Sequence, residues 1–271
     1  MPRLTAVDLF DKRTLLFLPA SNPRAIAKAR ACDADVVVLD LEDAVKPCDK
    51  GEARAAAVAA LDEPWPMPVA IRVNGTHSEW HAADVAAVAG SKADLVIVPR
   101  VSSASEIETV AAAVERPVAA MIETAAGVLA APAVARVAAA LIVGTNDLSA
   151  DLHLPTIDRN SLSFALQSAL IAARAAGIPA FDGVYNRLDD DAGLAAECAD
   201  SRRLGFDGKS LIHPQQIAAC HAAFAPSADE LARARRLVAA ASGGAERFEG
   251  EMIETMHLVI AQHLLKRYGN G

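Results

Sequence analysis

The sequence predicts a (β/α)8 barrel, also called a TIM barrel, followed by a short helical C-terminal extension. Eight short apolar runs recur before residue 225 of the 271-residue chain. Alanine-rich amphipathic segments separate these runs, and strands that alternate with helices are typical of βαβ units around a parallel sheet. Several runs are continuously apolar, as expected for strands buried on both faces. Eight such units in a chain of this length favour a closed barrel over an open sheet.

The predicted strands follow one another with room for a helix between them. The first covers residues 14–19, and Asn22-Pro23 then favours a helix over about 23–31, because Asn is a good N-cap and Pro suits the first turn. The clearest later helices cover 161–176 and 189–204. The other seven strands are predicted at 35–40, 69–74, 94–99, 117–122, 140–144, 180–185 and 208–213.

Two regions are expected, a barrel at residues 1–225 and a helical extension at 226–271. The extension is predicted to contain a helix at 229–241, a break at Ser242-Gly243-Gly244 and a final helix at 253–268. A barrel does not need this extension. It could close the bottom of the barrel, cover the active site, or pack on a neighbouring subunit.

Composition narrows the class of protein. The net charge is -8 and no block of Lys or Arg stands out, which argues against non-specific nucleic-acid or membrane-surface binding. The N-terminus, residues 1–4, lacks the apolar core of a signal peptide, and no apolar run is long enough to span a bilayer. The four cysteines show no C-x-x-C spacing, so we expect free thiols in a reducing cytoplasm. They are Cys32, Cys48, Cys198 and Cys220.

Two apolar runs end in a carboxylate, one in Glu123 and the other in Asp147. The carboxylates are 24 residues apart (147 minus 123), about one strand-helix repeat. If both runs are neighbouring parallel strands, the two side chains emerge side by side at the same end of the sheet. Such a pair can hold a hard divalent cation, commonly Mg²⁺ with Mn²⁺ as an alternative. It can equally cap the two helices that follow, and the spacing alone leaves both interpretations open.

Other charged residues also fall at strand ends, where TIM barrels carry their catalytic side chains. The run Asp40-Leu41-Glu42-Asp43 places three carboxylates in four residues. Arg72 lies between Ile71 and Val73, and a charge inside so apolar a strand is costly unless it is paired or bound. It is either a structural ion-pair partner or a fork-shaped donor for a substrate carboxylate or a developing oxyanion.

Weaker candidates surround the first and last strands. Arg13 and Arg24 could meet the phosphates of a large anionic substrate, or simply be solvated. His213, after the eighth strand, is expected to orient a neighbouring group or to be a hydrogen-bonded core residue rather than to bind metal. Glycine-rich phosphate loops of the G-x-G-x-x-G or G-x-x-x-x-G-K-[ST] type follow none of the predicted strands.

Seven motifs, taken in order, resemble one known family. They are RTLLFLP at 13–19, VLDLEDAV at 38–45, IRVN at 71–74, MIETA at 121–125, GTNDL at 144–148, GFDGK at 205–209 and IHPQQI at 212–217. In this set and order the chain resembles the citrate lyase beta-subunit-like family of CoA-thioester lyases. That family includes malyl-CoA and citramalyl-CoA lyases and belongs to the wider group of metal-dependent keto-acid aldolases.

The resemblance implies a role for each matching residue. Glu123 and Asp147 match the Mg²⁺ ligands, and Arg72 matches the arginine that contacts the keto-acid part of the substrate, against which Glu123 also lies. The run from Asp40 to Asp43 matches an acidic loop at the mouth of the site. The resemblance further implies a CoA-thioester or keto-acid substrate and a homotrimer or dimer of trimers.

Two positions depart from the family pattern. Asn146 stands where such proteins often have Glu, which removes one charge beside the metal. In the extension, Glu254 stands where relatives commonly have Asp with a proline two positions later. In the longer malyl-CoA lyases a tail aspartate of a neighbouring subunit looks like the catalytic acid/base. Glu254 could take that part.

The predicted chemistry is cleavage of a 3-hydroxyacyl-CoA between its second and third carbons. This needs loss of the hydroxyl proton and stabilisation of a thioester enolate, for which a Mg²⁺ ion would act as Lewis acid and Arg72 as oxyanion partner. The general acid or base would come from Asp40, Glu42, Asp43 or Glu254. Three alternatives remain: an aldolase on free hydroxy-keto acids, a citrate lyase subunit acting on an acyl-carrier-protein thioester, and a barrel that only binds.

Overall fold

The computed structural model describes residues 6–241 and 244–268. The N-terminal stretch used to argue against a signal peptide, and residues 242–243 of the expected break, lie outside this range. Within it, no helix combines the length and apolar character needed to cross a membrane. The chain divides into two compact units, with the boundary in the sequence between Phe224 and Ala225, and each unit is described by itself.

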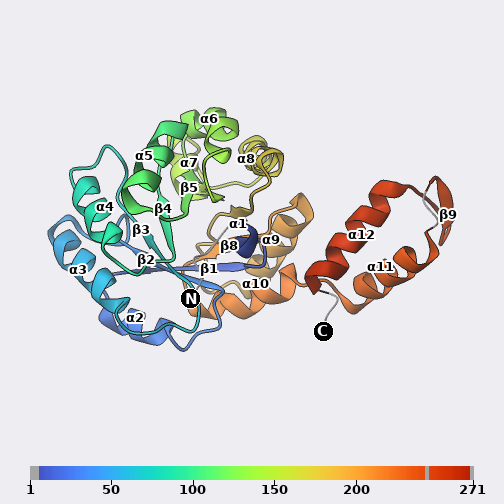
Figure 1. The fold of residues 1–271 in the computed structure, drawn as a ribbon, viewed down its shortest axis with the longest axis horizontal. Helices are drawn as coiled ribbons and strands as arrows, with labels where there is room; N and C mark the ends of the chain where they lie inside the picture. Colours follow the sequence, from blue (N-terminus) through green and yellow to red (C-terminus); the bar gives the residue numbers. More distant parts are fainter. Residues whose placement is uncertain (1–5, 242–243, 269–271) are drawn as a thin grey trace. The chain divides into compact units, whose positions relative to one another are not determined.

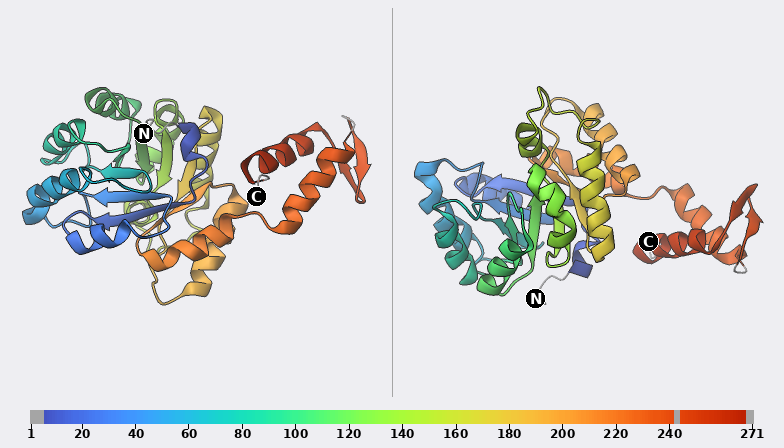
Figure 2. Two further views of the ribbon diagram at one scale, coloured as in Figure 1. Left: turned by 60° about the horizontal axis from the view of Figure 1, so that its bottom comes forward. Right: turned by 90° about the horizontal axis from the view of Figure 1, so that it is seen from above.

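The first unit is a closed barrel of eight parallel strands, and all eight predicted strands are present. Each strand pairs with the next, and the eighth closes the barrel by pairing with the first. Figure 1 shows the helices arranged around the strands, and Figure 2 shows the same arrangement from two further sides. The fold is therefore the predicted (β/α)8 barrel. The strands are β1 (Thr14–Pro19), β2 (Val36–Asp40), β3 (Val69–Arg72), β4 (Leu95–Val98), β5 (Val118–Ile122), β6 (Ala140–Val143), β7 (Ala180–Asp182) and β8 (Gly208–Leu211).

After α1, which precedes β1, the helices of this unit follow the strands in order, and β2, β6 and β8 are each followed by an additional short helix. At α2, Asn22 accepts a hydrogen bond from the amide of Ala25 and Pro23 occupies the first turn, as the sequence predicts. The helical elements are α1 (Ala6–Leu9), α2 (Pro23–Ala29), η1 (Pro47–Asp49), α3 (Lys50–Ala60), α4 (His81–Ala89), α5 (Ala104–Val114), α6 (Ala125–Ala135), α7 (Thr145–Asp151), α8 (Ser163–Ala176), α9 (Asp191–Leu204), η2 (Pro214–Gln216) and α10 (Ile217–Phe224).

Two apolar layers hold the barrel together. Alternate strand residues, among them Leu15, Val38 and Phe181, form one cluster in the lumen. The residues between them belong to the larger cluster that packs against the helices. Because side chains alternate along a strand, the lumen positions continue up each strand to its C-terminal end. On β2, β3 and β5 that alternation reaches Asp40, Arg72 and, one residue past the strand, Glu123.

The second unit is a helical hairpin with a small sheet between its helices. It consists of α11 (Ala228–Ala240), the antiparallel strands β9 (Glu246–Phe248) and β10 (Glu251–Ile253), and α12 (Thr255–Tyr268). The expected helix start at residue 253 is wrong, because Ile253 ends β10. Glu249 and Gly250 connect the strands and both have positive φ angles, 48° and 90°, the pattern of a two-residue hairpin turn.

Candidate active site

Glu123 and Asp147 follow neighbouring strands, as their spacing predicts. Glu123 comes directly after β5 and is 1% exposed, whereas Asp147 lies in the first turn of α7, after β6. Arg100 contacts both side chains. Its backbone N–H donates to Glu123 Oε1 at 2.6 Å, and its guanidinium donates to Asp147 Oδ1 at 3.1 Å. Arg100 reaches both from a left-handed backbone conformation with φ of 53°, which is rare outside glycine.

The second carboxylate oxygen of Glu123 differs from the first in its hydrogen bonding. Oε2 is buried and has no hydrogen-bond partner within the described residues. Gly144 makes room for it, since a side chain at that position would overlap the carboxylate. A buried, unpartnered carboxylate oxygen is costly, so this arrangement suits a group that binds there from outside the chain.

Both carboxyl groups resist ionisation. Burial raises the pKa of Glu123 to about 7, and the charge of Asp147 adds to this effect although Arg72 opposes it. Burial also raises the pKa of Asp147, together with the charge of Asp43. Within the described residues no group of three or more His, Cys, Asp or Glu side chains is placed to hold a metal ion. A cation here would therefore have two protein carboxylates and would take its remaining ligands from water or substrate, as Mg²⁺ commonly does.

Arg72 is both an ion-pair partner and a cavity-lining residue. Its Nε and Nη2 donate to the two oxygens of Asp40 at 2.6 Å each, a bidentate pair that is almost fully buried. Nη1 lies 2.9 Å from Glu42 Oε2, and the guanidinium carbon lies 5.3 Å from the centre of the Phe17 ring. Burial opposes the charge of Arg72, but Asp40 outweighs burial and raises the pKa of the guanidinium further. One edge of Arg72 is thus fixed, and the other faces the mouth.

The acidic loop after β2 contains three carboxyl groups in three environments. Asp40 is buried, and although burial works against its charge, Arg72 keeps its pKa below the ordinary value. Burial raises the pKa of Glu42 to about 8, so this group is protonated at neutral pH. The side chain of Asp43 is 61% exposed and lies 3.8 Å from Arg72 Nη1. Of the three, Asp40 is the one committed to holding Arg72.

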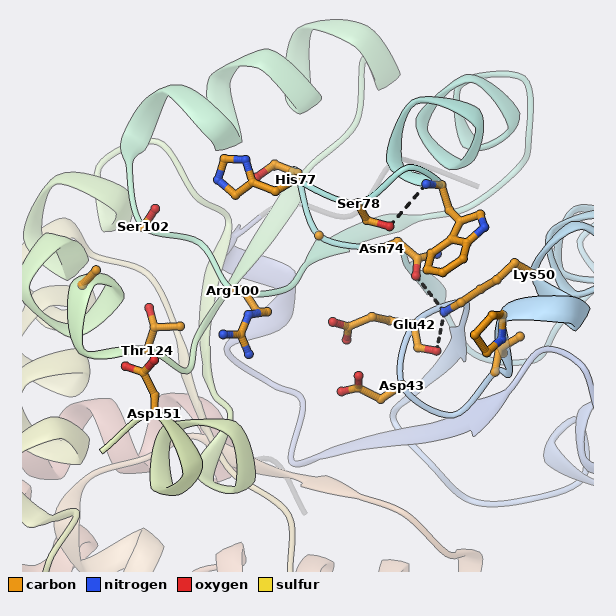
Figure 3. A pocket seen from close by; sticks show the side chains of 16 residues that line it. Glu42, Asp43, Lys50, Asn74, His77, Ser78, Arg100, Ser102, Thr124 and Asp151 are labelled. Atoms are coloured by element: carbon orange, nitrogen blue, oxygen red, sulfur yellow. Dashed lines mark hydrogen bonds between the residues drawn. The ribbon is translucent and has the colours of Figure 1, made fainter. Parts of the chain in front are cut away.

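Lys50 anchors this loop, a role that was not predicted from the sequence. Its Nζ donates three hydrogen bonds of 2.7 Å, to the carbonyl oxygens of Leu41 and Glu42 and to Asn74 Oδ1. Asn74 in turn donates to Asp84 at 2.6 Å. Figure 3 shows Lys50 reaching the loop from one side while the carboxyl groups of Glu42 and Asp43 point into the neighbouring cavity.

Three cavities meet at the C-terminal ends of the strands. The central one, about 360 Å³, is lined by Arg72, Glu123 and Asp147 together with apolar side chains. On one side it shares Phe17 to Pro19 and Ile212 with a groove of about 620 Å³ that contains Arg24, Lys28 and His213. On the other side it shares Asp43 with a cavity of about 640 Å³, which Figure 3 shows with Arg100 opposite the acidic loop.

The other predicted site residues fall elsewhere. Arg13, predicted to bind substrate, precedes the first residue of β1 and lies at the opposite end of the barrel, where its amide donates to Asp35; that prediction is wrong. The prediction took into account that Arg13 lies next to β1, but not that it lies at the N-terminal end of this strand. Glu254 lies in the second unit just before α12, so it is not among the residues that the barrel itself brings together.

Asn146 and two hydroxyl groups complete the mouth. Asn146 exchanges two hydrogen bonds, of 3.2 and 2.8 Å, with Asn186 from the loop after β7, so the position that departs from the family pattern links two loops. Thr145 and Ser210 line the central cavity, and both hydroxyl oxygens are buried without a partner in the described part of the chain. Neither residue was predicted from the sequence to belong to the site. For Ser210 the only available signal was a small polar residue inside an apolar strand.

An eight-stranded parallel barrel whose charged side chains converge at the C-terminal ends of its strands has the architecture of a TIM-barrel enzyme. The chain belongs to the HpcH/HpaI aldolase/citrate lyase family, whose model matches residues 13–214. The resemblance found in the sequence motifs is therefore confirmed, and the protein is an enzyme of the metal-dependent carbon–carbon lyase class.

Relatives of known name cover nearly the whole chain. The (3S)-malyl-CoA thioesterase of Cereibacter sphaeroides is 40% identical over an alignment of 273 positions, which covers 94% of this chain and 94% of that protein. The citrate lyase subunit beta of Escherichia coli is 33% identical over an alignment of 280 positions, which covers 94% of this chain and 93% of that protein. The CitE protein of Mycobacterium tuberculosis, solved with magnesium, acetoacetate and coenzyme A, gives a TM-score of 0.86 at 34% identity over 96% of this chain and 98% of that one.

Proposed function

We propose that this protein is a Mg²⁺-dependent lyase that cleaves or forms a 3-hydroxyacyl-CoA thioester, such as malyl-, citramalyl- or citryl-CoA. The products of cleavage are an acyl-CoA and a keto acid. The observation that carries the proposal is the sharing of one 360 Å³ cavity by the carboxylates of Glu123 and Asp147 and the guanidinium of Arg72. The CitE relative holds magnesium, a keto acid and coenzyme A together, which supports this combination of ligands.

Glu123 and Asp147 are the residues that would hold the metal. The fit rests on the unpartnered Oε2 of Glu123, the space left by Gly144, and the preference of Mg²⁺ for carboxylate oxygens. When bound, Mg²⁺ supplies Lewis-acid polarisation and a template for the substrate oxygens, and Mn²⁺ has the same ligand preference.

Arg72 would stabilise the keto-acid end of the substrate. Asp40 holds two of its nitrogens, so the remaining edge at Nη1 is oriented before any substrate arrives. A fixed guanidinium donates two hydrogen bonds to a carboxylate or to a developing oxyanion without losing side-chain freedom at that moment. This is the substrate-contacting role that the sequence predicts for Arg72.

The groove beside β1 would take the coenzyme A portion. Arg24 and Lys28 both line it, and the groove opens into the central cavity along Phe17 to Pro19 and Ile212. Two cations along an open groove suit a diphosphate, and the apolar connection suits the pantetheine arm. The proposal therefore keeps the predicted contact between Arg24 and a phosphate group and drops the one predicted for Arg13.

Two members of the acidic loop would move the protons. Asp43, exposed and shared by two cavities, takes the proton of the 3-hydroxyl group. The oxygen's electron pair then forms the carbonyl of the keto acid, the bond between the second and third carbons breaks, and its electrons pass into the thioester as an enolate. Glu42, protonated because its pKa is about 8, donates its proton to the second carbon.

Purified protein with Mg²⁺ and a panel of 3-hydroxyacyl-CoA esters provides the test, with products separated by mass spectrometry. We expect release of a keto acid and an acyl-CoA, loss of turnover in EDTA, and loss of turnover in Glu123→Ala and Asp147→Ala. Asp62→Ala, which changes an exposed surface carboxylate, is the matched control. Full activity in EDTA together with an unimpaired Glu123 or Asp147 variant overturns the proposal.

A second candidate, hydrolysis of the same thioester, is favoured by the relative named (3S)-malyl-CoA thioesterase. In that reaction water replaces the CoA sulfur at the carbonyl carbon, and the products are a free 3-hydroxy acid and CoA. The same product assay separates the two reactions, since hydrolysis gives no keto acid. Turnover only of free hydroxy-keto acids, or only of acyl-carrier-protein thioesters, would instead identify the aldolase and citrate lyase alternatives.

Three further expectations remain proposals. Glu254 is the alternative proton carrier, supplied by the extension, and an inactive Glu254→Gln beside an active Glu42→Gln would favour it. We also propose a homo-oligomer, a trimer or a dimer of trimers, and a cytoplasmic location. Light scattering of the purified protein tests the oligomer.

A further inference from the structure

We infer that the hydroxyl group of Ser210 donates a hydrogen bond to the thioester carbonyl oxygen of the acyl-CoA and stabilises the enolate formed there. The inference rests on the proposed function and adds to it a residue for the half of the reaction that Arg72 does not reach. No family motif used above assigns a role to this position.

Ser210 belongs to the lumen face of β8. Its register partner on β1 is Leu15, a member of the lumen cluster, whereas the next residue, Leu211, packs in the outer layer. Because side chains alternate along the strand, Ser210 faces into the barrel. There it lines the central cavity that also contains Arg72 and Glu123.

The hydroxyl group of Ser210 is not used by the fold. The residue is 2% exposed, and Oγ has no hydrogen-bond partner among the described residues. Buried serines elsewhere behave differently: Ser91 Oγ donates to the carbonyl of Val88 at 2.8 Å and accepts from the amide of Ala93. An unpartnered hydroxyl group costs free energy that alanine would avoid at the same volume, so its presence points to a partner supplied by the ligand.

The direction of entry selects the thioester as that partner. The groove with Arg24 and Lys28 joins the central cavity beside β1 and Ile212, which follows β8 directly. An acyl-CoA that enters this way passes Ile212 before its thioester reaches the cavity, so its carbonyl group meets β8 first. Thr145 also has an unpartnered hydroxyl group, but it follows β6, on the metal side, and its side chain packs over Gly183.

The chemistry favours a donor at this point. Cleavage moves an electron pair onto the thioester oxygen, and a hydrogen bond to a charged oxygen is stronger than one to the neutral carbonyl. Ser210 therefore contributes more to the transition state than to substrate binding, which is the requirement for faster turnover. Its effect is expected in kcat more than in KM.

Two substitutions, Ser210→Ala and the control Ser91→Ala, test the inference in the full-length protein. For Ser210→Ala we expect kcat of the lyase reaction to fall about 10- to 100-fold, and calorimetric affinity for acetyl-CoA to fall about two- to tenfold. Affinity for CoA, which has no carbonyl group at the sulfur, stays unchanged. The thermal midpoint stays equal or rises. Ser91→Ala, whose hydroxyl group is fully used at the other end of the barrel, should lower the midpoint and leave kinetics intact.

The outcomes separate this inference from the proposed function. Wild-type protein that neither binds CoA nor turns over a thioester overturns both. Active wild-type protein with an unchanged kcat in Ser210→Ala, and an unchanged ratio of acetyl-CoA to CoA affinity, overturns the role of Ser210 alone. A lower thermal midpoint in Ser210→Ala with equal losses for CoA and acetyl-CoA also overturns it, because that result describes a packing residue.

Discussion

Replacing Glu123 with glutamine should stabilise the metal-free protein and at the same time remove its response to Mg²⁺. The carboxyl group is 1% exposed, and burial followed by the charge of Asp147 raises its pKa to about 7 despite the attraction of Arg72. Glutamine has nearly the same volume, and its Oε1 can still accept the hydrogen bond from the backbone of Arg100. The substitution therefore removes a charge without opening a cavity.

The sign and size of the effect follow from the two protonation states of Glu123. Below about pH 4.5 the group is protonated in both the folded and the unfolded protein, so its ionisation does not reduce the free energy of unfolding. Between pH 4.5 and 7 it ionises only in the unfolded state, so the free energy of unfolding of the wild type falls by about 1.4 kcal/mol per pH unit. The loss reaches about 3 kcal/mol near pH 7 and then stops growing, and the glutamine variant escapes it.

Magnesium should reverse this order. A ligand present at 100 times its dissociation constant stabilises the folded state by about 2.7 kcal/mol. Wild-type protein in saturating Mg²⁺ should recover about that amount at pH 7.5, whereas Glu123→Gln, with one carboxylate left in the pair, should gain little. Stability and function therefore oppose each other at this residue, as they often do in binding sites.

Urea titrations between pH 5 and 8, in EDTA and in MgCl₂, provide the measurement. The fluorescence of Trp65 and Trp80 reports on the barrel. Glu63→Gln, which changes a carboxylate that is 75% exposed, is the control and should follow the wild type throughout. Unfolding free energies of wild type and Glu123→Gln that stay parallel across this pH range would refute the reasoning. So would an equal response of the two proteins to Mg²⁺.

Three other substitutions probe the groups around the metal pair. Asp40→Asn leaves the buried guanidinium of Arg72 without its bidentate partner and should cost about 3–5 kcal/mol of unfolding free energy in urea, and a loss near zero would contradict this. Lys50→Met releases the acidic loop and should lower kcat by up to about 100-fold, whereas Lys92→Met on the surface should change nothing. Arg100→Met removes a half-exposed cation from the carboxylate pair and should tighten Mg²⁺ binding by up to about fivefold in calorimetry; weaker binding would mean that Arg100 helps to hold the ion.

The parts of the site that sequence could predict are those set by strand periodicity. A lumen position recurs every second residue, so an apolar strand that ends in a charged residue brings that residue to the mouth. Glu123 and Arg72 followed from this rule alone. The prediction for Arg13 failed because it considered only that the residue is close to a strand, and not at which end of the strand it lies. The hairpin in the extension was not predicted because its strands have three residues each, too few for a visible alternation of apolar and polar residues.

The parts that sequence could not predict depend on contacts between distant segments. Lys50 is a loop anchor only because Asn74, 24 residues away, comes to lie beside the same carbonyl groups. The sequence showed that Asn146 departs from the family pattern, but it did not show that this side chain forms hydrogen bonds with Asn186. The unpartnered hydroxyl group of Ser210 is likewise a property of its surroundings. None of these contacts leaves a periodic signal along the chain.

Protonation of Glu42 decides whether Arg72 can serve a substrate at all. Asp40 already neutralises the guanidinium through two of its nitrogens, and Glu42 lies 2.9 Å from the third. Because burial raises the pKa of Glu42 to about 8, its carboxyl group is neutral at pH 7 and leaves the charge at Nη1 available to a substrate anion. Above pH 8 Glu42 ionises and competes for the same nitrogen. Calorimetric binding of a keto acid should therefore weaken between pH 7 and 9, and Glu42→Gln should bind equally well at both; a wild type that is indifferent to pH would separate Glu42 from the substrate site.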